Sequence, residues 1–252
     1  YTEVADLHSD DTQDVDLGVY WKVMGATPDT SVTVDGQGGT DASVAAVAMA
    51  FRGVDPTTPM DVTPTTATGI NTMHPNPPAI DYVSTGVWTV IAGASGHALN
   101  LANTNNPYTF PSGYTTNNVQ RPENDTSDVT VGLGYRTNPA DPEDPGVMTH
   151  SGTDSTSYSW AAVTIALRPK PPSTFNQSAY RFFNNLDSTD VGSPLANQDT
   201  PASLTSAGQA FRLRLLIHVG TSNLLANEQS FKLQFGTSTG SSCTSSPPAS
   251  WA

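Results

Sequence analysis

Three stretches of the chain alternate with a period of two, and no stretch of similar length repeats its apolar residues at the spacing of a helix. They are residues 16–24, 43–51 and 210–219. In residues 210–219 one side of the pattern is apolar and consists of Phe211, Leu213, Leu215 and Ile217. Successive side chains of an extended strand face opposite sides, so each stretch can bury one face and leave the other in water. The pattern therefore predicts an all-β fold.

The chain has 252 residues, which is enough for one large or two ordinary β domains. Hydrophobic residues make up 36% of it and charged residues only 13%, so its polar surface comes from Ser, Thr, Asn and Gln. This composition is common in extracellular shells and fibres, whereas a cytoplasmic enzyme usually has about a quarter of its residues charged. Because the chain begins at Tyr1 rather than Met, we expect it to be a processed product whose targeting segment lies outside this numbering.

Charge and cysteine content exclude several classes of partner. The net charge is −13 and the ten Lys and Arg residues are scattered, so we expect no nucleic-acid binding, which needs clustered cations. Attraction to anionic lipid is disfavoured for the same reason. No apolar run approaches the roughly 20 residues that span a bilayer, so no membrane span is expected. The single cysteine, Cys243, allows neither an internal disulfide nor a cysteine-based metal cluster.

Prolines divide the chain. Residues 54–78 contain six prolines and are expected to form a long loop or the edge of a sheet, because proline cannot donate to a central ladder. The run Pro169-Lys170-Pro171-Pro172 is typical of a short, stiff linker. We therefore expect a first domain at residues 1–168, a linker at residues 169–174 and a second domain at residues 175–252 that ends in a flexible tail.

The pattern of apolar and turn residues predicts ten strands, at residues 16–24, 31–34, 43–51, 87–94, 128–135, 158–167, 178–184, 202–205, 210–219 and 230–235. Residues 96–125 are expected to cross the surface, and residues 93–97 (GASGH) and 139–146 to form turns. Residues 43–51 carry small side chains on both faces, as a strand covered on both sides would. A helix is the rival interpretation there, because alanine favours helix.

The second domain is short of strands. Four are predicted in residues 175–252, or five at most, whereas an immunoglobulin-like sandwich uses about seven. A shortfall leaves an open sheet edge and an exposed apolar groove, which natural proteins usually cover. A strand from another subunit would cover it. The alternative is a strand in the same domain that the pattern does not reveal.

Two sets of segments resemble known modules. Residues 51–62 (FRGVDPTTPMDV) and 157–169 (SYSWAAVTIALRP) resemble a β-sandwich module of uncharacterised environmental proteins, including predicted phage structural proteins. Residues 180–201, 211–220 and 231–236 resemble an immunoglobulin-like module of large secreted proteins from uncultured bacteria. Together they cover most of the chain, and the combination resembles the protomer of pilus-like helical fibrils found in fresh water. The resemblance implies two β-sandwiches, the N-terminal one jelly-roll-like and the C-terminal one immunoglobulin-like.

The resemblance also implies how subunits join. In those fibrils an N-terminal strand of one subunit completes an immunoglobulin-like domain of another, so the expected partners are copies of this chain. Residues 1–7 are the donor candidate, through Tyr1, Val4, Ala5 and Leu7, with residues 8–16 as a tether. The acceptor groove would be lined by Phe211, Leu213, Leu215, Phe231, Leu233 and Phe235. The alternation of residues 1–7 is weak, which counts against a strand that enters a deep groove.

An energy comparison limits what one donated strand can do. About five ladder hydrogen bonds and two buried apolar side chains contribute roughly 8–11 kcal/mol. Association costs about 4–15 kcal/mol. A stable fibre therefore needs further contacts between subunits. Head-to-tail donation does not close on itself and so propagates a filament.

The residues that could carry chemistry do not form a catalytic motif. The five histidines are His8, His74, His97, His150 and His218, and none has a paired spacing. The GASGH segment lacks the G-x-S-x-G order of a nucleophile elbow. Acidic residues at positions 10–16 and 141–144 lie in segments with turn composition, where we expect solvated side chains rather than a hydrolase pair. We therefore expect no catalytic residue, no cofactor and no enzymatic activity.

Calcium and glycans are the remaining ligands to consider. Acidic residues at positions 10–16, 123–128 and 187–190 could supply oxygen ligands, but none matches the spacing of an EF-hand, so no metal residue is predicted. Asn124 and Asn176 begin N-x-[ST] sequons and are candidate glycosylation sites, and the threonines of residues 57–68 could carry O-linked sugar.

The composition and the resemblance favour a structural subunit of an extracellular, pilus-like filament. The alternative is a binding module, either a phage tail or fibre component or a carbohydrate-binding adhesin. The aromatic residues that could contact a sugar are Trp88, Tyr108, Tyr114 and Trp251. A secreted hydrolase is a third class, and it would require carboxylates that converge in a cleft.

Overall fold

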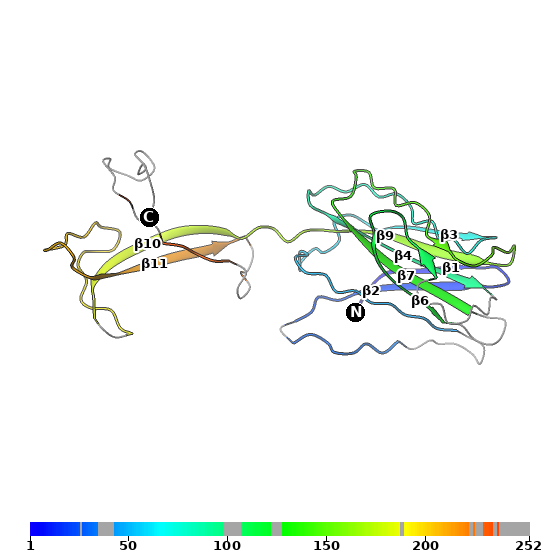
Figure 1. Cartoon of the computed structure of the whole chain (residues 1–252), viewed down its shortest axis with the longest axis horizontal. Helices are drawn as coiled ribbons and strands as arrows, with labels where there is room; N and C mark the ends of the chain where they lie inside the picture. Colours follow the sequence, from blue (N-terminus) through cyan, green and yellow to red (C-terminus); the bar gives the residue numbers. More distant parts are fainter. Residues whose placement is uncertain are drawn as a thin grey trace. The chain divides into compact units, whose positions relative to one another are not determined.

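The computed structural model describes residues 1–25, 27–34, 43–97, 107–121, 128–186, 189–221, 224, 229–233 and 236. The chain divides into two compact units, Tyr1–Lys170 and Pro171–Ala252, and the division falls within the proline-rich run at residues 169–172 (Figure 1). The regular secondary structure of the described residues is entirely β, which confirms the predicted all-β class. Those residues include no helix with the length and apolarity needed to cross a bilayer.

The first unit is built on a five-stranded antiparallel sheet (Figure 1). Its strands, in spatial order, are β3 (Thr65–Ile70), β9 (Ser159–Leu167), β4 (Trp88–His97), β7 (Asp128–Thr137) and β6 (Thr115–Arg121). The two central strands, β4 and β9, are buried along almost their whole length. Both consist mainly of small and β-branched residues, as a strand covered on both faces requires.

One face of this sheet is covered by the hairpin of β1 (Thr2–Ser9) and β2 (Val15–Trp21). Ala5 of β1 is buried against Val90 and Val163 in the main sheet. Residues 44–51 continue the same layer in an extended conformation, with every second side chain turned inward. The two layers enclose the main hydrophobic core, so the first unit is organised like a β-sandwich.

The opposite face is covered by loops and by two short strands, β5 (Tyr108–Thr109) and β8 (Thr149–His150). Met148 and Tyr108 pack here against Ile91 of β4. A Cβ atom at Gly93 would lie 2.7 Å from Cβ of Pro75 and 2.8 Å from Sδ of Met148. Glycine at this position therefore lets the covering loops approach the sheet closely.

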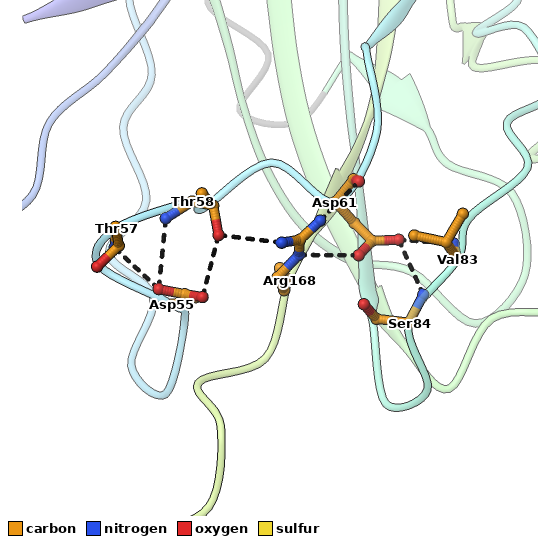
Figure 2. A network of polar contacts seen from close by, with 7 residues as sticks. All are labelled: Asp55, Thr57, Thr58, Asp61, Val83, Ser84 and Arg168. Carbon is orange, nitrogen blue, oxygen red and sulfur yellow. Dashed lines mark hydrogen bonds and ion pairs between the residues drawn. The ribbon is translucent and has the colours of Figure 1, made fainter. Parts of the chain in front are cut away.

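An ion pair between the buried Asp61 and the half-buried Arg168 fastens two loops of the first unit to the end of β9 (Figure 2). Arg168 Nε donates to Asp61 Oδ1 at 3.1 Å, and Arg168 Nη1 donates to Thr58 Oγ1 at 3.1 Å. Asp61 Oδ2 accepts from the backbone N–H groups of Val83 and Ser84, at 2.7 and 3.1 Å. Burial alone would raise the pKa of Asp61, but these hydrogen bonds together hold that pKa below its ordinary value.

In the described residues of the second unit, β10 (Thr174–Asn184) and β11 (Phe211–Gly220) form one hairpin. Its register shifts between Gln177 and Ala179, so one residue of β10 bulges out of the ladder. Residues 193–199 run along the other edge of β10, because Leu195 N–H donates to Phe182 C=O at 3.0 Å and Asp199 N–H donates to Tyr180 C=O at 2.9 Å.

Most of the long predicted strands are confirmed. Those at residues 16–24, 87–94, 128–135, 158–167, 178–184 and 210–219 correspond to β2, β4, β7, β9, β10 and β11. The predictions at residues 31–34 and 202–205 are wrong, because neither segment forms a strand. Residues 230–233 are not a strand either, and residues 234–235 lie outside the described residues.

Three other predictions need correction. Residues 95–97 are not part of a turn but continue β4 to His97. Residues 96–125, expected only to cross the surface, contain β5 and β6, while the proline-rich region contains β3 at the edge of the main sheet, one of the two placements expected for it. These strands were missed because their polar and threonine-rich sequences lack a clear apolar alternation. Residues 43–51 are extended but belong to no ladder, so neither the strand nor the rival helix is observed.

Candidate functional site

The apolar face of the β10–β11 hairpin is the most unusual surface in the described part of the chain. The register places Phe182 opposite Leu213 and Tyr180 opposite Leu215 on this face. The apolar side chains that share it are Phe175, Tyr180, Phe182, Phe211, Leu213, Leu215, Ile217 and Val219. Phe211 is 44% exposed and Leu215 is 40% exposed. A contiguous apolar surface of this kind marks a binding surface in a soluble protein.

On the other face of the hairpin, the arginine side chains have partners within the same unit. The guanidinium groups of Arg181 and Arg214 each lie 5.6 Å from the centre of the Phe183 ring. Arg212 donates through Nη1 to Asp190 C=O at 3.0 Å and through Nη2 to Leu186 C=O at 2.5 Å. The cationic side chains therefore cover the part of this face around Phe183 and fix the loop that follows β10, whereas Leu216 and His218 on the same face remain exposed.

The outer edge of β11 is open. Within the described residues, its backbone pairs only with β10. An unpaired edge beside an apolar face offers both of the contacts that an added strand needs, namely ladder hydrogen bonds and side-chain burial. The hairpin is therefore a sheet to which a strand can be added.

The predicted acceptor residues are partly gathered on this hairpin. Phe211, Leu213 and Leu215 lie together on the apolar face of β11. Phe231 contacts Phe175 edge to face at 5.1 Å, yet remains 58% exposed, and Leu233 is exposed as well. Phe235, the last predicted member, lies outside the described residues. The acceptor role of these residues stays a prediction.

The predicted donor residues lie in β1 of the first unit. Ala5 is buried in the main core, and Val4 and Leu7 are half-buried against it. Tyr1 is exposed, and the Nζ atom of Lys22 lies 5.5 Å from the centre of its ring. In this chain the segment therefore already has a partner, because β1 pairs with β2 along Thr2–Ser9. A donor role would require β1 to leave that pairing, and it stays a prediction.

The sequence did not reveal a network of buried histidines on the loop-covered face of the main sheet. His97 Nε2 and His150 Nε2 lie 3.0 and 3.1 Å from the same atom, Thr130 Oγ1. The backbone N–H of His150 donates to His74 Nδ1 at 2.9 Å, and His74 Nε2 lies 3.3 Å from Asp154 Oδ2. The five residues come from distant parts of the chain, so no local spacing signals the network.

Burial keeps the two inner histidines of this network neutral. It lowers the pKa of His97 to about 4. Burial, with the nearby His97 and His74, lowers the pKa of His150 to about 3. The two neutral imidazoles share the buried hydroxyl of Thr130, so the network joins β4, β7 and β8 by polar contacts inside the covered face. His218, by contrast, is exposed on β11.

The acidic clusters divide between the surface and the interior. Asp10, Asp14 and Asp16 are exposed, as predicted. Glu143 is not solvated, because it is 1% exposed and accepts hydrogen bonds from Tyr114 Oη at 2.9 Å and Arg136 Nη1 at 3.1 Å. The prediction of a wet turn at residues 141–144 is therefore wrong for this residue, whose carboxylate anchors a loop on the covered face.

The cluster of possible metal ligands and the described N-glycosylation candidate lie at the surface. Ligand atoms of His8, Asp10 and Asp14 lie within 4.8 Å of one another, but all three residues are exposed and the cluster has no further feature of a binding site. Asn176 is exposed on β10 and open to modification, whereas Asn124 lies outside the described residues.

The aromatic candidates for sugar contact differ in exposure. Tyr108 is buried and Trp251 lies outside the described residues, so neither is available in the described surface. Trp88 is half-buried and stacks on Tyr135 at 5.8 Å, with Phe51 packed edge to face against both. A shallow depression of about 390 Å³ opens beside them, and Arg52 forms part of its wall.

The buried histidines predict a loss of stability in mild acid. The folded pKa values of His97 and His150 lie below the ordinary value of 6.5, so the unfolded chain binds protons first as the pH falls. The free energy of unfolding should therefore fall between pH 6.5 and 4, and at pH 5 each histidine should lower it by roughly 2 kcal/mol. Calorimetric unfolding at pH 7.5 and pH 5 measures this change.

Two variants separate this effect from other titrations. His150→Gln should flatten the pH dependence, whereas His218→Gln, at an exposed position, should leave it as in the wild type. An unfolding free energy that stays constant from pH 7.5 to 5 in the wild type would contradict the neutral state of the buried pair.

Comparison of the chain with protein-family models, curated proteins and solved structures finds no match in any of the three. The role of the chain therefore has to be inferred from its own residues.

Proposed function

We propose that this chain is the structural subunit of an extracellular, pilus-like filament whose copies are joined by β-strands that pair between chains. The observation that carries the proposal is the hairpin of the second unit, with its exposed apolar face and the open edge of β11. A two-stranded hairpin alone is at best marginally stable in water, and three or more strands with a covered face are needed. Another copy of the chain can supply the missing cover.

The finer fold assignments belong to the same proposal. The first unit, with a five-stranded sheet and a covering hairpin, is compatible with a jelly-roll-like sandwich. The second unit would be an immunoglobulin-like domain that lacks some of its strands until assembly. A structural role needs no catalytic site, and the polar clusters at His150, Glu143 and Asp61 serve as internal anchors. The role of the chain would then be mechanical rather than enzymatic.

The assembly proposal predicts that filament formation depends on the apolar face of β11 and not on its opposite face. Leu215→Asp places a charge on the apolar face, so filaments seen by negative-stain electron microscopy should be lost. Leu216→Asp is the matched control, because Leu216 is 61% exposed on the opposite face, where Arg214 also lies. It should assemble as the wild type does. Equal assembly of both variants, or no filaments from the wild type at any concentration, would count against the proposal.

Donation by residues 1–7 can be tested by locking β1 in place. His8 and Asp16 face each other across the β1–β2 ladder, with side-chain atoms 2.6 Å apart. Cysteines at both positions, with Cys243→Ser, should form a disulfide that holds β1 on β2. Donation by residues 1–7 requires β1 to leave, so this form of the proposal predicts that the oxidised variant does not assemble and that the reduced variant recovers. Filaments of the oxidised variant would show that the joining strand lies elsewhere.

A carbohydrate-binding module is the second candidate function. The depression beside Trp88, Tyr135 and Phe51 favours it, because aromatic rings and an arginine are common contacts for sugar rings. This alternative predicts that discrete monomers bind a glycan array and that Arg52→Ala weakens the binding about ten-fold, a loss of about 1.4 kcal/mol. Filaments without glycan binding would leave only the structural role.

A further inference from the structure

Residues 44–51 form an extended segment that is apolar on both faces. The sequence VAAVAMAF contains no polar or charged side chain. Ala45 and Val47 pack inward against the core, and Phe51 packs against Trp88 and Tyr135. The outward side chains are all exposed, and they are Val44, Ala46, Ala48 and Ala50. A strand of this composition is normally covered on both faces, yet here the outer face is bare.

The backbone of this segment is also without a partner. Within the described ranges, no backbone group of residues 44–51 is hydrogen-bonded to another segment. By contrast, β1 and β2 in the same layer pair with each other along their length, from Thr2–Trp21 to Ser9–Val15. An extended, apolar and unpaired segment is therefore, like β11, an open β edge with apolar side chains beside it.

Charge indicates which part of another copy can meet this edge. Residues 1–170 contain 19 acidic and 6 basic residues, so they carry the whole net charge of −13, whereas residues 171–252 contain four of each. Two copies of the first unit would repel each other across such a contact. The second unit is neutral, and its open strand, β11, contains Arg212, Arg214 and His218 but no acidic residue.

We propose that residues 44–51 of one copy pair, edge to edge, with β11 of a second copy. The inference rests on the proposed function and names residues 44–51, in place of residues 1–7, as the segment that pairs with the one open edge of β11 in a neighbouring subunit. Eight residues of extended chain span roughly 26 Å, and the ten residues of β11 are long enough to cover them. The two edges lie in different units, so the contact is heterologous, and each copy keeps one edge of each kind for the next neighbour.

Site-specific photocrosslinking of the full chain tests this pairing. A benzoylphenylalanine at position 46 should crosslink to residues 211–220 of another copy, and mixed light and ¹⁵N-labelled chains distinguish crosslinks between copies from those within one. The same probe at Val83, which is 78% exposed in a loop of the first unit, is the control and should not reach β11. Ala48→Lys puts a cation beside a basic strand and should lower the yield about five-fold, whereas Ala48→Ser should leave it unchanged.

The possible outcomes distinguish failure of the proposed pairing from failure of the proposed function. Filaments in which position 46 crosslinks only within its own chain, or only to residues 1–170 of a neighbour, overturn the pairing and leave the proposed function standing. Filaments without any crosslink from position 46 do the same. Absence of filaments at every concentration overturns the proposed function. In that case, crosslinks between two copies in solution still show whether residues 44–51 of one copy contact β11 of the other.

Discussion

A β-strand has hydrogen-bonding groups along two edges, and this requirement organises the whole molecule. In the main sheet of the first unit, β4 and β9 have a paired neighbour on each side and cover on both faces. These two strands hold the buried core, and the loops, the β1–β2 hairpin and the histidine network are all placed by contact with that sheet. Among the edges that stay unpaired in the described residues, those of β11 and of residues 44–51 carry apolar side chains, whereas the edge strands β3 and β6 are rich in threonine and polar residues. The open edges of β11 and of residues 44–51 are therefore suited to pairing with a strand of another chain.

The sequence predicted the strands that carry a clear alternation and failed where polar residues form them. Residues 158–167 and 210–219 were recognised because apolar side chains recur at every second position. β3 and β6 were not, since TTATGI and TTNNVQR pair through backbone groups that leave no trace in the apolar pattern. The GASGH composition predicts a turn because glycine and serine usually interrupt strands, whereas in β4 these small residues allow close packing.

The candidate site was only partly predictable for the same physical reason. The apolar face of β11 follows directly from its alternation, so Phe211, Leu213 and Leu215 could be grouped from the sequence alone. The contact of His97 and His150 through Thr130 could not, because it depends on how distant segments are brought together. Glu143 was misjudged because a turn composition says nothing of whether the turn is later covered.

The ion pair of Arg168 and Asp61 stands at the point where β9 leaves the first unit toward the proline-rich run. Tension on the chain beyond residue 170 would reach the first unit through this strand. β9 is held between β3 and β4, and a pull along its length loads both ladders in shear. Bonds loaded in this way share the force instead of opening one after another. One of the two most buried strands is thus also the one through which mechanical load would enter the domain.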